Sequence, residues 1–140
     1  AIYKRLFLLD GNYDYLSKAK SLYERGYIIK RDYYNGENLA NCQVLALQKE
    51  KISEEERNYL IYSCKKIYTD LIEIIEKSLG EAERNYWMYA TMATSCLCVG
   101  KKEMYKEYEE MFLESAIAEW EKETYYKNLK NVKICLKIDE

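Results

Sequence analysis

Residues 54–79 constrain the fold more strongly than any other stretch, because apolar side chains recur there at helical spacing over about seven turns. One stripe advances in steps of four and three residues, and a second stripe runs beside it. The two stripes comprise Leu60, Cys64, Ile67, Leu71 and Ile74, and Ile61, Tyr68, Ile72, Ile75 and Leu79. A face of this width contacts two neighbouring elements, so the segment predicts a long helix that packs between two others.

Helical spacing extends over the rest of the chain, and there is no proline to make a helix stop or kink. Ser53 and Glu56 form a capping box before the long helix, and Gly80 is placed to end it. Ser115 is expected to cap a final helix that includes the alternating run 132–138. The expected helices cover residues 1–9, 15–29, 32–49, 54–79, 85–99, 104–114 and 115–138.

Two stretches, residues 32–50 and 85–103, carry similar residues at corresponding positions. Both share a tyrosine, an alanine and a Lys-Glu pair, and both begin at a good N-cap residue. We expect them to contain the first helices of successive hairpins. The prediction is an all-α fold of about seven helices, with antiparallel hairpins in a right-handed, tetratricopeptide-like stack that touch only their neighbours. Residues 1–140 are expected to form one helical-repeat domain, a piece of a longer protein.

Composition argues against several classes of function. The chain has no histidine, the commonest general base and metal ligand, and its five cysteines show no Cys-x-x-Cys spacing. We expect free, buried thiols in a cytoplasmic protein, with no cofactor and no metal. A net charge of −2 without a basic stripe argues against a nucleic-acid surface. The longest uncharged run, residues 85–100, is shorter than the ~20 residues of a membrane span.

A semi-polar groove is expected along the first helices of the hairpins. Asn38 and Asn41 are three residues apart and share a helix face, where side-chain amides can bond the backbone of an extended peptide. A structural interpretation competes, because Asn38 can instead satisfy a backbone group at a hairpin junction. The groove candidates are Tyr34, Glu37, Asn38, Asn41, Trp87, Thr91 and Thr94.

Other conspicuous residues have simpler interpretations. Trp87 and Trp120 can anchor a partner, but tryptophans in a helical stack more often fill the space between helices, and we expect both in the core. The acidic run at residues 54–56 opens a helix, whose dipole favours negative charge there. Glu121 and the glutamates on either side of it at 119 and 123 are expected to be solvated.

Residues 11–45 carry a more specific pattern. A helix with Leu16, Ala19, Leu22, Tyr23 and Gly26 is followed by Asp32-Tyr33-Tyr34 and then by Gly36, Asn38 and Ala40. This pattern resembles the TRAF-binding, tetratricopeptide-like region of mitogen-activated protein kinase kinase kinases of the apoptosis-signal-regulating type, which also occurs in bacterial proteins. Glu37 and Asn41 depart from it, since the family has small or apolar residues there. The resemblance implies a helical-repeat scaffold that binds proteins, regulates an attached effector domain and carries no catalytic residues.

The expected function is a non-catalytic module that binds a protein or peptide segment in a preformed groove, or associates with another copy of itself. Two alternatives stay open. One is a helical enzyme with a cleft of carboxylates and tyrosines, in which Glu37 pairs with an acid from another helix. The other is a structural spacer in a longer signalling protein. An open groove lined by first helices favours binding, whereas a closed pocket with paired acids favours catalysis.

Overall fold

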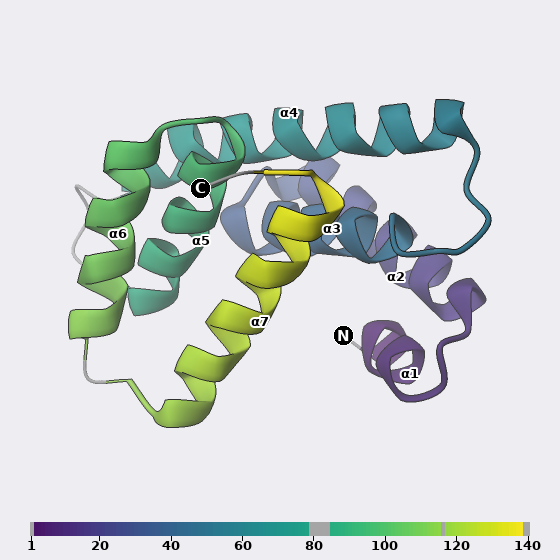
Figure 1. The fold of residues 1–140 in the computed structure, drawn as a ribbon, viewed down its shortest axis with the longest axis horizontal. Coiled ribbons are helices and arrows are strands. Elements are labelled where there is room, and N and C mark those ends of the chain that lie inside the picture. The colour runs from purple at the N-terminus through teal and green to yellow at the C-terminus, as the bar shows by residue number, and fades with distance from the viewer. Residues whose placement is uncertain (1, 79–84, 116, 139–140) are drawn as a thin grey trace.

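The computed structural model describes residues 2–78, 85–115 and 117–138, and every regular element in these ranges is a helix. The seven helices confirm the all-α prediction (Figure 1). Ala1, Leu79 and Gly80 lie outside the described residues. The helices are α1 (Ile2–Asp10), α2 (Tyr13–Lys30), α3 (Tyr33–Ala46), α4 (Glu54–Ser78), α5 (Tyr86–Cys98), α6 (Lys102–Glu114) and α7 (Glu119–Cys135).

The first six helices form a stack in which each helix contacts the next along the chain (Figure 1). The hairpins are α1 with α2, α3 with α4, and α5 with α6. The two similar stretches of sequence supply α3 and α5, which contact each other across the stack. This packing of neighbouring helices is that of a tetratricopeptide-like stack, as the periodicity predicted.

Polar side chains cap the first turn of α2, α4 and α5. The Asn12 side chain accepts the Asp14 amide before α2, and the Asn85 side chain accepts the Trp87 amide before α5, both at 2.9 Å. The Ser53 hydroxyl accepts the Glu56 amide at 3.1 Å, which confirms the predicted cap of α4. These caps satisfy amides that the first turn of a helix leaves without a partner.

The prediction that Ser115 caps the final helix is wrong. Its hydroxyl donates to the Met111 carbonyl at 3.0 Å, so Ser115 closes α6 instead. The final helix begins at Glu119, and the Glu121 carboxylate accepts the Ala118 amide at 2.9 Å. The helix also ends at Cys135, short of the expected residue 138.

The core consists of two adjoining clusters, and α4 contributes to both. Tyr68 and Leu71 belong to a cluster built mainly with α2 and α3, whereas Ile72 and Ile75 belong to a cluster built with α5 and α6. The long helix therefore packs against two neighbours, α3 and α5, as its double stripe predicted. All five cysteines are free and buried, as expected.

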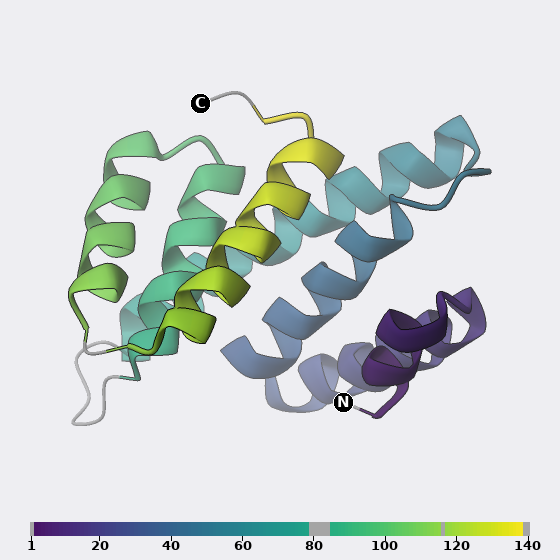
Figure 2. The same ribbon diagram turned by 60° about the horizontal axis from the view of Figure 1, so that its bottom comes forward.

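Helix α7 departs from the stack. It crosses in front of α3 and α5 and contacts both (Figures 1 and 2). The expectation that hairpins touch only their neighbours is therefore wrong at this helix, because α3 and α7 are far apart in sequence. Its apolar residues Tyr125, Leu129 and Val132 are buried between α7 and the stack.

The path of α7 also overturns two expectations about individual side chains. Trp120 was expected in the core, but it lies in the first turn of α7 and is 64% exposed. Glu121 was expected in solvent, but it is buried against α5, where it accepts a hydrogen bond from the Tyr86 hydroxyl. Leu22, which belongs to the pattern noted in residues 11–45, is exposed on α2 as well.

Candidate functional site

A groove with a volume of about 310 Å³ lies between α1, α3, α5 and α7. The floor of the groove is formed by α1, α3 and α5, which are the first helices of the three hairpins. Helix α7 forms one wall of the groove. The predicted candidates that line it are Glu37, Asn38, Asn41, Trp87 and Thr94. One face of α3 and one face of α5 therefore bring five of the seven candidates together.

The other two candidates lie elsewhere. Tyr34 is 54% exposed, and its ring makes an edge contact with the Tyr23 ring at 6.3 Å instead of lining the groove. Thr91 is buried behind the groove floor and donates a hydrogen bond to the Glu37 carboxylate. Thr91 therefore holds Glu37 in place and is not itself a wall of the groove.

A carboxyl and an ammonium group lie together at the α1 side of the groove. Burial raises the pKa of Glu37 above its ordinary value of 4.5, although the Thr91 hydrogen bond and the Lys4 charge oppose the shift. Burial also lowers the pKa of Lys4 below 10.5. The Lys4 ammonium donates to the Asn38 side-chain oxygen at 3.3 Å. Both shifts favour the uncharged forms, so this corner offers a carboxyl group and an amine to a bound group.

The groove asparagines have partners within the chain. The Asn38 amide donates to the Tyr34 carbonyl one turn earlier on α3, at 2.9 Å, which matches a structural role. The Asn41 amide donates to the Asn128 side-chain oxygen of α7 at 2.6 Å. Asn41 therefore bonds a side-chain amide of a helix in this structure.

Several lining residues were not predicted. Lys4 comes from α1, while Thr124, Asn128 and Asn131 come from α7. Asn128 and Asn131 have the same spacing of three as Asn38 and Asn41, so a sequence signal for a second polar helix face was present. The signal could not show that α7 lies across the groove.

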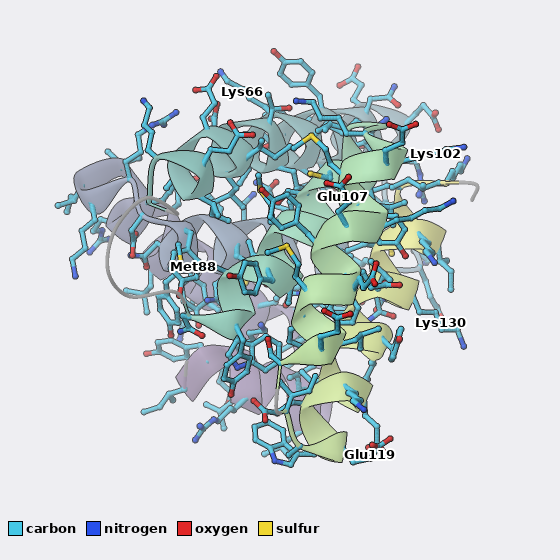
Figure 3. All side chains as sticks on the ribbon, turned by 90° about the vertical axis from the view of Figure 1, so that its left-hand side faces the viewer. Lys66, Met88, Lys102, Glu107, Glu119 and Lys130 are labelled. Atoms are coloured by element: carbon cyan, nitrogen blue, oxygen red, sulfur yellow. The ribbon has the colours of Figure 1, made fainter. Side chains whose placement is uncertain are left out.

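Three contacts with α5 and α6 hold the first half of α7. The hydrogen bond from the Tyr86 hydroxyl, and secondarily that from the Ala118 amide, lowers the pKa of Glu121. The Tyr125 hydroxyl donates to the Glu109 carboxylate of α6 at 2.7 Å, and its ring lies 4.8 Å from the Phe112 ring. On the opposite face of α7, Lys130 points away from the stack into solvent (Figure 3).

The groove offers hydrogen bonds and an aromatic surface, without paired acids. Among the described residues that line it, Glu37 is the one carboxylate, so the second acid required by the enzyme alternative is not found there. The described part of the chain holds no cluster of three histidine, cysteine, aspartate or glutamate residues suited to a metal ion. None of the helices within the described ranges is both long and apolar enough to cross a membrane.

Comparison with known proteins gives a match to the N-terminal part of the chain. Residues 1–48, which contain α1, α2 and α3, match a family model described as Tetratricopeptide Repeats-Sensor, TPR-S. No curated protein and no solved structure matches the chain. The matched 48 of 140 residues include the run 11–45 singled out in the sequence, and this part of the chain is similar to tetratricopeptide repeats.

Proposed function

We propose that this chain is a non-catalytic interaction module that binds a protein segment in the groove between α1, α3, α5 and α7. The observation that carries the proposal is the semi-polar groove on the face of the first helices. Its volume of about 310 Å³ is at the lower end for ligand sites and suits a few side chains of a partner. The amides of Asn38 and Asn41 supply hydrogen bonds, and Trp87 supplies an aromatic anchor.

The likeness to tetratricopeptide repeats supports a scaffold role, since stacked helical hairpins present extended surfaces for binding. The resemblance of residues 11–45 to the TRAF-binding region of apoptosis-signal-regulating kinases supports a more specific role. In this proposal residues 1–140 act as one helical-repeat domain in the cytoplasm, and occupancy of the groove regulates an attached effector. Self-association through the same face is a second mode of binding that the proposal includes.

Site-specific photocrosslinking tests the proposal. Leu8 lines the groove and is exposed, so p-benzoylphenylalanine can replace it with little disturbance. Tyr62 is exposed on α4, which does not line the groove, and is the matched control position. With the crosslinker at position 8, we expect the chain to form an adduct with a protein of the lysate. The adduct should be absent when the crosslinker is at position 62, and the Trp87→Ala substitution should reduce the adduct from position 8. Equal adducts from both positions, or an adduct indifferent to Trp87→Ala, would contradict the proposal.

A further inference from the structure

Helix α7 already occupies part of the groove face, and it does so as an amphipathic helix. Tyr125, Leu129 and Val132 are spaced by four and three residues, so they share one face of α7. All three are buried against the stack. Tyr125 and Leu129 belong to the core cluster of α5 and α6, while Val132 belongs to that of α2 and α3. The face formed by α1, α3 and α5, called the concave face below, therefore accommodates the side-chain spacing of a helix.

Polar contacts place α7 in one register on this face. Asn128 lies next to Leu129 and accepts the Asn41 amide at 2.6 Å. Near the start of the helix, Glu121 accepts the Tyr86 hydroxyl. Asn41 in the groove and Tyr86 at the start of α5 thus contact an amide and an acid separated by seven residues, which is two turns of a helix.

The side of α7 next to its apolar stripe faces the groove and is not packed into the core. Thr124, Asn128 and Asn131 of α7 face the open groove together with Asn38 and Thr94 of the stack. α7 is therefore packed against the stack along one side and lines the open, semi-polar groove along the other. The contacts that join α1 to α6 along the chain do not involve α7, so we expect release of α7 to be a local opening of the structure.

We propose that the concave face binds an amphipathic helix of a partner protein, and that α7 is the internal occupant which this helix displaces. The inference rests on the proposed function and specifies the partner's chemistry. The partner helix carries an acid, an aromatic residue four positions later, an amide three positions after that, and aliphatic residues one and four positions beyond the amide. This is the pattern of Glu121, Tyr125, Asn128, Leu129 and Val132.

Competition between the internal and the external helix makes a quantitative prediction. The apparent affinity for a partner is reduced by the fraction of molecules in which α7 leaves the face free. Substitutions that weaken docking of α7 without altering the concave face should therefore strengthen binding in trans. Substitutions on the concave face itself should weaken it.

The probe is a fluorescein-labelled peptide with the sequence of residues 117–138, and its binding to the full chain is measured by fluorescence anisotropy. Asn128→Ala combined with Leu129→Ala weakens the internal helix only, and we expect at least tenfold tighter peptide binding than to wild type. Lys130→Ala, on the solvent face of the same helix, is the matched control and should leave binding unchanged. Equal affinity of the double variant and wild type would overturn the inference.

Thiol alkylation of the wild-type chain gives a second readout that does not depend on a folded variant. Cys135 is buried on α7, whereas Cys64 is buried on α4. Excess unlabelled peptide, made with Cys135→Ser so that its own fragment differs in mass, should accelerate alkylation of Cys135 in the chain, read by mass spectrometry of residues 134–137, and leave Cys64 protected. Peptide binding without exposure of Cys135, or exposure of both thiols together, would overturn the inference.

The outcomes separate the inference from the proposed function. If the adduct formed from position 8 survives an excess of the helical peptide, the groove binds a segment of another kind and the inference alone fails. If position 8 gives no groove-dependent adduct, the proposed function fails first. A dimer of the double variant in light scattering would identify a second copy as the source of the helix and overturn the assignment to a separate partner.

Discussion

Replacing Gly36 with alanine tests how closely α3 approaches its neighbours. A Cβ atom at this position would lie 2.8 Å from Cδ2 of Leu71 and 2.9 Å from the ring of Tyr27. Both neighbours are buried and cannot turn into solvent, so the backbone of α3 has to shift. Overpacking of this kind costs about 1–3 kcal/mol, while the better helix propensity of alanine returns about 1 kcal/mol. The expected net loss is about 1 kcal/mol of unfolding free energy.

Gly26 in α2 provides a matched control, because it is also a helical glycine with a close neighbour. A Cβ atom there would meet the Asn35 side chain at 2.6 Å. Asn35 is half-buried and can rotate, at the loss of its 2.8 Å hydrogen bond to Asp32. That bond contributes about 1 kcal/mol, which the gain in propensity offsets. Gly26→Ala should therefore be close to neutral.

Urea unfolding followed by far-ultraviolet circular dichroism compares the two variants with wild type. We expect the midpoint of Gly36→Ala to fall by about 0.5 M at an unchanged slope, and that of Gly26→Ala to stay near wild type. The two substitutions gain similar helix propensity, so the difference between them reports the overpacking at Gly36 less the hydrogen bond of Asn35 that Gly26→Ala breaks. If Gly36→Ala is as stable as Gly26→Ala, the close approach of α3 to α2 and α4 is wrong.

Two further predictions concern titrating groups at the groove. Because burial raises the pKa of Glu37, its stabilising contribution is full below about pH 4.5 and is lost as the pH rises through the folded pKa. The Glu37→Gln variant should not show this loss of stability. The unfolding free energy of the variant minus that of wild type should therefore increase between pH 4.5 and 8. A difference that stays constant over this range would refute the assignment. Tyr86→Phe should raise the pKa of Glu121 towards 4.5, measured by carbon NMR of the side-chain carboxyls, and an unchanged titration would show that the hydrogen bond is absent.

Much of the fold could be predicted because helical periodicity is a local property of the chain. The double stripe of residues 54–79 required two neighbours for one helix, and α4 has α3 and α5. The caps at Ser53 and Asn85 act within three residues and were equally visible. The prediction for Ser115 was wrong because a serine at a helix boundary can either cap the next helix or donate to a carbonyl of the preceding helix. Ser115 donates to the preceding helix.

The groove was partly predictable for the same reason. Residues three and four apart on α3 share a face wherever that helix lies, so Glu37, Asn38 and Asn41 had to project together. The position of α7 was not predictable, because its apolar stripe is compatible with any apolar partner surface. The hydrogen bond between Asn41 and Asn128 joins residues 87 positions apart, and no local pattern encodes a contact of that range.

The sequence by itself determined the helices, their order and the shared faces of α3 and α5, because each depends on side chains within a few turns of one another. Only the tertiary structure decided that α7 crosses the concave face, which buries Glu121 and leaves Trp120 in solvent. The physical reason is that burial of an apolar stripe is favourable against any complementary surface, so the choice of surface depends on the shape and polar groups of the whole stack.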